Sequence, residues 1–152
     1  MADFLPDRVE VPVDVERAAV PFWLLQKHSA SGDIILNRAG PISGIDVFIG
    51  NGNNSADGVL ILKLCNANEC VSASRNLTES IDNSFLHFKL DQPMLIERPE
   101  RMQYEFQLRE GTHPMALWTY TESPSKSVTL IAEGQNMASV PRFRIRYLPE
   151  KN

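Results

Sequence analysis

The chain has 152 residues, the length of one ordinary domain, and 43% of them are apolar, which is enough for a hydrophobic core. Its net charge is −4 and no basic stripe dominates, so we expect no nucleic-acid partner. No apolar run approaches the roughly eighteen residues of a membrane-spanning helix, so we expect no membrane span in this chain.

Residues 1–21 contain three prolines and no basic region followed by an apolar core, so they do not resemble a signal peptide. We expect them to form an extended lead-in or an edge strand. Beyond them, apolar residues recur in short runs between turn clusters such as "SASGD", "GNGNNSADG", "CNANEC" and "DQP". This spacing predicts short strands at 22–28, 42–49, 58–64, 71–75, 85–90, 102–109, 115–120, 128–132 and 142–147.

Three of these runs alternate between apolar and polar residues, as half-buried strands do. In "MQYEFQLR" (102–109), Met, Tyr, Phe and Leu are predicted to face the core. "FLHFKL" (85–90) and "RFRIRY" (142–147) repeat the pattern. "GVLILKL" (58–64) is apolar on both faces, which favours a central strand.

Eight or nine short strands with regular turn spacing predict an all-β fold, an antiparallel β-sandwich. We favour a jelly roll of the galactose-binding-like type. A single β-sandwich domain is expected to occupy residues 22–148, with residues 149–152 as a tail. The sequence shows no internal repeat and no second domain.

The loop "NGNNSADG" has the alternating oxygen ligands that open a helix–loop–helix calcium motif, but the match then fails. The position of the required glutamate is Leu64, and a strand follows in place of a helix. Asn, Asp and Gly are also the natural residues of a hairpin loop, which is the interpretation we favour. A calcium site built from Asp57 and backbone carbonyls is the alternative; we expect no other metal and no other cofactor.

Cys65 and Cys70 are separated by four residues, and each lies at the end of a predicted strand. The chain has no further cysteines and only scattered histidines, so a zinc site is excluded, and C-x4-C lacks the spacing of redox catalysis. Two free thiols or one disulfide across a tight hairpin remain. We favour the disulfide, which indicates an oxidising compartment.

No catalytic constellation is visible, so we expect a non-enzymatic protein without catalytic residues. The sequence contains no G-x-S-x-G nucleophile elbow and no phosphate-binding glycine loop, and its carboxylates are scattered. Glu97, Glu100 and Glu105 are close in sequence, but glycoside hydrolysis needs two carboxyls that face each other across a cleft.

Two groups of side chains are candidates for ligand binding. Exposed aromatic rings stack on sugar rings, which makes Trp118, Tyr120 and Trp23 candidates, and the first two share a face of one strand if that strand is regular. The row Arg142, Arg144 and Arg146 is the second group. Each aromatic residue can instead belong to the core, and the arginines can be solvated or paired with groups such as Glu105.

The ordered series "ISGIDVFIG", "DGVLILKLC", "NLTESIDNSFLHFKL" and "MQYEFQLREGTHPMALWTY" resembles one known group of domains. These are the jelly-roll, carbohydrate-binding-module-like domains attached to bacterial membrane glycosyltransferases and related envelope-polysaccharide proteins. The resemblance covers about residues 22–147 and depends on order and spacing. The matching residues are Ile42, Gly44, Ile45, Gly58, Asp82, Asn83, Phe85, Phe88, Tyr104, Phe106, Ala116, Leu117 and Trp118.

The resemblance implies a non-catalytic accessory module on the periplasmic or extracellular side of a bacterial membrane, as a fragment of a larger protein. It implies recognition of a glycan or lipid-linked saccharide for a membrane glycosyltransferase system, with contact to the parent membrane enzyme or a neighbouring domain. The alternative is a purely structural protein–protein interaction domain with no sugar site.

Overall fold

The computed structural model of the protein describes residues 8–12, 20–25, 28–121 and 127–149. Over these residues the protein consists of two antiparallel β-sheets and one short 3₁₀ helix, so the predicted all-β sandwich is confirmed. Some of the predicted segments lie partly outside the described residues. These parts are residues 1–7 and 13–19 of the lead-in, residues 26–27 of the strand predicted at 22–28, and residues 150–152 of the tail.

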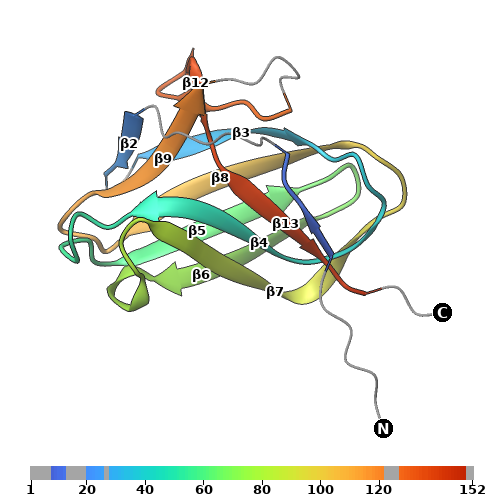
Figure 1. Ribbon diagram of the computed structural model, residues 1–152, viewed down its shortest axis with the longest axis horizontal. Coiled ribbons are helices and arrows are strands. Elements are labelled where there is room, and N and C mark those ends of the chain that lie inside the picture. Colours follow the sequence, from blue (N-terminus) through green and yellow to red (C-terminus); the bar gives the residue numbers. More distant parts are fainter. Residues whose placement is uncertain (1–7, 13–19, 26–27, 122–126, 150–152) are drawn as a thin grey trace, which may run out of the picture.

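The described residues form thirteen strands, and most of them are labelled in Figure 1. They are β1 (Arg8–Glu10), β2 (Val20–Leu24), β3 (Ser29–Ile35), β4 (Gly40–Gly50), β5 (Val59–Cys65), β6 (Cys70–Asn76), β7 (Ser84–Ile96), β8 (Arg101–Arg109), β9 (Met115–Thr121), β10 (Ile131–Ala132), β11 (Gln135–Asn136), β12 (Ser139–Pro141) and β13 (Phe143–Tyr147). The 3₁₀ helix η1 spans Leu77–Glu79.

Strands β2 to β9 form nested antiparallel pairs. The innermost pair is β5–β6, around which β4–β7, β3–β8 and β2–β9 follow in turn. The chain is therefore one long hairpin, and it rolls up because β5 also pairs with β8 and β4 also pairs with β9. This arrangement is a jelly roll, as predicted.

The nested strands are distributed between two sheets. The six-stranded sheet has the order β11-β10-β3-β8-β5-β6, and the seven-stranded sheet contains β1-β13-β4-β9-β12, with β2 on β9 and β7 on β4. Eight of the nine predicted strands correspond to β2, β4 to β9 and β13, and the one predicted at 128–132 corresponds in part to β10, whereas β3 lies where the sequence predicts a turn. Strands β1 and β10 to β12 have only two or three residues each.

Alternate residues of the facing strands fill the space between the sheets. The predicted inward residues of β8 and β13 are all buried, and the rings of Tyr104, Phe106 and Phe143 lie within about 6 Å of one another. Strand β5 is paired on both sides, so its predicted central position is confirmed, although Lys63 on its outer face is exposed.

The segment "SASGD" is a strand and not the predicted turn. It forms most of β3, in which Ala30 and Ile34 point into the core and the polar residues between them face outward. Gly32 lies opposite Tyr104, and a Cβ atom there would overlap the carbonyl group of Thr129. Small residues are therefore needed in this strand because it packs closely on an adjacent segment. Turn propensity alone does not distinguish such a strand from a turn.

The segment "DQP" also lies within a strand, β7, and not in a turn between strands. Its residues are accommodated by a β-bulge, since the partners on β4 shift from Gly44↔Lys89 to Ile42↔Met94. The bulge absorbs Pro93, which has no N–H group to donate to the sheet. Conversely, the strand predicted at 128–132 is regular only at Ile131–Ala132, with a single bridge from Val128 to Ile34.

The loop "NGNNSADG" is not the predicted hairpin, because β4 and β5 belong to different sheets. It crosses from one layer of the sandwich to the other. Asn53 and Asn54 adopt positive φ angles in it, and Asp82 accepts backbone hydrogen bonds from Asn51 and Asn53. Asp82 therefore ties this crossing loop to the start of β7. No helix among the described residues has the length and apolar character needed to cross a membrane.

Candidate functional site

Charged and aromatic side chains from five strands, β2, β4, β7, β9 and β13, lie on the outer face of the seven-stranded sheet, together with that of Arg142 just before β13. In the register, Asp46 on β4 is flanked by Arg144 on β13 and His87 on β7, and Phe48 lies opposite Phe85. We call this surface the arginine–aromatic face and define it by Trp23, Asp46, Phe85, His87, Trp118, Tyr120, Arg142, Arg144 and Arg146.

Asp46 is the centre of the polar part of this face, and its side chain is only 1% exposed. Its Oδ2 accepts hydrogen bonds from Nε of Arg144 at 3.0 Å and from Nε of Arg146 at 2.9 Å. Its Oδ1 lies 2.5 Å from Nδ1 of His87, which donates to it. Three strands are thus joined through one carboxylate.

The charge of Asp46 is stabilised by these neighbours. Burial alone raises the pKa of this carboxyl, because the charged form loses water. Hydrogen bonds from Arg146 and His87 and the charges of Arg146 and Arg144 outweigh burial, so the pKa lies below its ordinary value. Asp46 is therefore ionised at neutral pH.

Two of the arginines lie against the ring of Phe85. The guanidinium carbon of Arg144 is 3.7 Å from the ring centroid, and that of Arg142 is 5.3 Å from it. Arg142 also lies 5.8 Å from the ring of Tyr120. Cation–π contacts of this kind hold a planar guanidinium in place while it keeps its charge.

The tryptophans occupy neighbouring strands of the same face. Trp23 on β2 pairs with Ala116 on β9, so Trp118 is its diagonal neighbour, and Trp23 is 49% exposed. Nε1 of Trp118 donates to Asn83, and the ring lies close to Gly50, where a Cβ atom would be 2.8 Å from Nε1. Trp118 is partly exposed, whereas Tyr120 is buried.

The predicted ligand-binding residues therefore belong to one surface. Trp118 and Tyr120 share a face as their spacing indicated, and the arginine row is joined to them through Phe85 and Tyr120. The predicted arginine partner Glu105 is wrong, since Glu105 lies on the other sheet and the carboxylate between the arginines is Asp46.

Sequence reasoning missed Asp46, His87 and Phe85 as members of this face. Asp46 interrupts the apolar run "ISGIDVFIG", and an acidic residue in a buried strand is a signal for a paired charge. His87 and Phe85 belong to a strand that was recognised, but their neighbours across the sheet depend on the rolled topology.

A separate groove of about 290 Å³ lies on the outer face of the six-stranded sheet. None of the predicted ligand-binding residues lines it. Its lining includes the polar side chains of Asp33, Gln103 and Glu105, and Arg101 forms an ion pair with Asp33 at 3.3 Å.

The oxygens of Asp57 are engaged by protein groups. Oδ1 accepts the backbone N–H groups of Thr112 and His113, and Oδ2 accepts the hydroxyl of Thr112 at 2.6 Å. The pKa of Asp57 lies below its ordinary value, chiefly because the side chain of Thr112 donates a hydrogen bond to the carboxylate. Asp57 thus fastens the β8–β9 loop, and the described part of the chain contains no group of three His, Cys, Asp or Glu side chains arranged to hold a metal ion.

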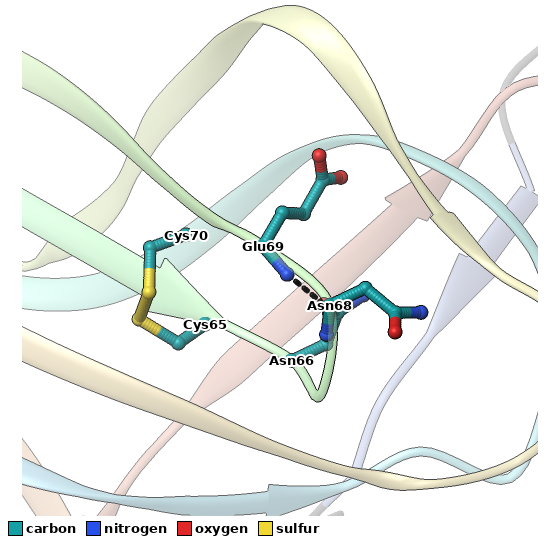
Figure 2. Close-up of a disulfide and its surroundings, with 5 residues drawn as sticks. All are labelled: Cys65, Asn66, Asn68, Glu69 and Cys70. Carbon is teal, nitrogen blue, oxygen red and sulfur yellow. Dashed lines mark hydrogen bonds between the residues drawn. A yellow bond between two sulfur atoms is a disulfide. The ribbon is translucent and has the colours of Figure 1, made fainter.

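Cys65 and Cys70 form a disulfide, as predicted, between the last residue of β5 and the first of β6 (Figure 2). In the loop between them, the side-chain oxygen of Asn66 accepts the backbone N–H groups of Asn68 and Glu69. The bridge closes the tip of the innermost hairpin of the jelly roll.

No family model matches the chain, and no curated protein and no solved structure matches it significantly.

Proposed function

We propose that the protein is a non-catalytic, extracytoplasmic accessory module that recognises a glycan or lipid-linked sugar through the arginine–aromatic face. One observation carries this proposal: Trp23 and Trp118 lie exposed or partly exposed on adjacent strands of one face that also bears hydrogen-bond donors. Aromatic rings bind the apolar faces of sugar rings, and fixed polar groups beside them bind hydroxyls.

The surroundings of Trp118 support this role. Its indole is held by Asn83 and by the close approach of Gly50, so little side-chain freedom is lost on binding. The disulfide supports a site of action outside the cytoplasm, because such bridges persist in oxidising compartments. A periplasmic location beside a membrane glycosyltransferase is the setting that the family resemblance implies.

A second candidate function is a structural protein–protein interaction domain without a sugar site. Strand β2 favours it, since β2 pairs only with β9 among the described strands and carries the exposed side chains of Val20 and Trp23. A free strand edge with apolar side chains can accept a strand from a partner protein.

A glycan array read together with saturation-transfer NMR separates the two candidates. We expect binding to a subset of neutral or acidic envelope glycans, and loss of that binding in Trp118→Ala with unchanged circular dichroism. Leu95→Ala is the matched control. Leu95 is 56% exposed, but it lies near the end of β7, whereas the arginine–aromatic face lies near the start of this strand. If the unmodified protein binds no glycan on the array, the result would favour the interaction domain.

A further inference from the structure

We infer that the ligand of the arginine–aromatic face is acidic, a saccharide with a carboxylate or phosphate group that binds between Arg142 and Arg144. The inference rests on the proposed function and adds the chemical class of the ligand. Three observations carry it: the state of Arg142, the unused donors of Arg144 and the charge of the face as a whole.

Arg142 has cation–π contacts but no carboxylate. Its guanidinium lies between the rings of Phe85 and Tyr120, at 5.3 and 5.8 Å. Its Nε is enclosed and donates no hydrogen bond, and no ion pair joins Arg142 to any described residue. The residue is partly buried, so its charge is incompletely solvated and uncompensated, and an anion would satisfy it.

Arg144 has donors left for a ligand. Its Nε donates to Asp46, and within the described part of the chain this is the only hydrogen bond of the Arg144 side chain. Its side chain is 35% exposed and lies on the same Phe85 ring as Arg142. The terminal nitrogens of a planar guanidinium match the two oxygens of a carboxylate or phosphate.

The charge balance of the face favours an anion. Arg144 shares the single negative charge of Asp46 with Arg146, and Arg142 has no ion pair with a described residue. The whole chain has a net charge of −4, so the positive charge of Arg142 and Arg144 is opposite in sign to the net charge of the molecule. Such a patch attracts anions and raises their rate of encounter.

The test is a panel of matched oligosaccharide pairs, in which each acidic member is printed beside its carboxyl-reduced or dephosphorylated form. We expect the protein to prefer the acidic member by roughly tenfold or more, as charge-assisted hydrogen bonds require. Binding should weaken as sodium chloride is raised from 50 to 500 mM, because salt screens the attraction. A comparison of the carboxylate pairs with the phosphate pairs then shows which of the two anions the protein binds.

Arg142→Gln should reduce the preference for the acidic member to near unity. Arg142→Lys, which keeps the charge but lacks the planar fork, should retain part of it. Arg109→Gln is the matched control, because Arg109 is exposed on the outer face of the other sheet, and it should leave the preference unchanged. Thermal melting of each variant shows whether the fold is intact.

The outcomes distinguish this inference from the function on which it rests. Equal binding to both members of every pair would overturn the acidic ligand and leave glycan recognition standing. Acidic preference that survives Arg142→Gln in a folded protein would overturn the assignment to this residue. No binding to any member would overturn the proposed function and the inference with it.

Discussion

At the scale of single residues, Asp46 explains how a carboxylate can be buried on the outer face of a sheet. Larger side chains close over it, since Arg144, Arg146 and His87 come from the strands on either side. An aspartate is rarely this buried unless it is paired. The result is that β7, β4 and β13 are joined by side chains as well as by backbone hydrogen bonds.

The first prediction concerns this carboxylate. Asp46→Asn keeps the size of the side chain but removes its charge, and with it the ion pairs that Arg144 and Arg146 form with this carboxylate. We expect a loss of about 2 kcal/mol in the free energy of unfolding, below the usual cost of breaking a fully buried pair because both arginines are partly exposed. Urea unfolding measures the change.

Asp91→Asn is the control, because Asp91 is an exposed aspartate on β7. It should change the stability by less than about 0.5 kcal/mol. Equal effects of the two substitutions would show that the ion cluster adds nothing to stability.

The second prediction is a pH dependence that follows from the lowered pKa of Asp46. The folded state binds the proton more weakly than the unfolded state, so the contribution of Asp46 is fully present above the unfolded value, about 3.8. It is lost as the pH falls through the lower pKa of the folded state. The stability difference between the unmodified protein and Asp46→Asn should therefore shrink between pH 5 and pH 2, as urea midpoints at each pH would report. A constant difference would contradict it.

At the scale of strands, the sequence correctly predicts those strands in which apolar and polar residues alternate. "MQYEFQLR" and "RFRIRY" are strands with the expected inward residues, because their periodicity reports burial directly. The residue types of "SASGD" and "DQP" favour turns, but β3 and β7 continue through them. Contacts with distant segments make these two segments strands, and the turn or strand propensity of the local residues carries no information about such contacts.

The candidate site shows the same limit. Aromatic and arginine side chains were selected by type, and the rolled topology brings them to one face. Asp46 could not be assigned as their partner from the sequence, because pairing of β4 with β13 joins residues about a hundred positions apart. Register across the sheet is fixed only by the complete fold.

The third prediction tests the packing of β3. Gly32→Ala places a methyl group on the carbonyl of Thr129 and against the ring of Tyr104, whose hydroxyl donates to that carbonyl at 2.7 Å. We expect a loss of about 2 kcal/mol, as for other overpacked sites. Ser31→Ala, on the outer side of the same strand, should be nearly neutral in the same urea experiment. A neutral Gly32→Ala would mean that the segment 127–130 moves away without cost.

The fourth prediction concerns the β5–β6 hairpin. The sequence separation of the bridged cysteines is 5, so the loop that they close is short. Replacing both cysteines by serine should cost about 2 kcal/mol on the chain-entropy model, with the sheet content unchanged by circular dichroism. Reduction of the unmodified protein should lower its stability to that of the double variant. An equal stability of the oxidised and reduced protein would contradict the prediction.

At the scale of the whole molecule, nested pairing means that successive hairpins close increasingly long loops. The pair β5–β6 is local, whereas β2–β9 joins residues near 20 to residues near 119. Folds dominated by such distant pairings fold slowly, in milliseconds to seconds. The disulfide closes only the shortest of these loops, and so it restricts the unfolded chain the least.

The fifth prediction follows from this order. Refolding monitored by tryptophan fluorescence should take milliseconds to seconds, and the reduced protein should refold within about threefold of the oxidised rate, because the distant pairings limit the rate in both. A reduced protein that refolds more than tenfold slower would indicate that the hairpin tip nucleates the fold.

One feature of the seven-stranded sheet bears on how this domain can be carried by another protein. Strand β1, near the start of the described chain, pairs with β13 near its end, with Arg8 opposite Tyr147 (Figure 1). The first and last described strands are therefore neighbours at one end of the seven-stranded sheet. A domain of this kind can be grafted into a surface loop of a host, or circularly permuted with a short linker, without stretching either junction.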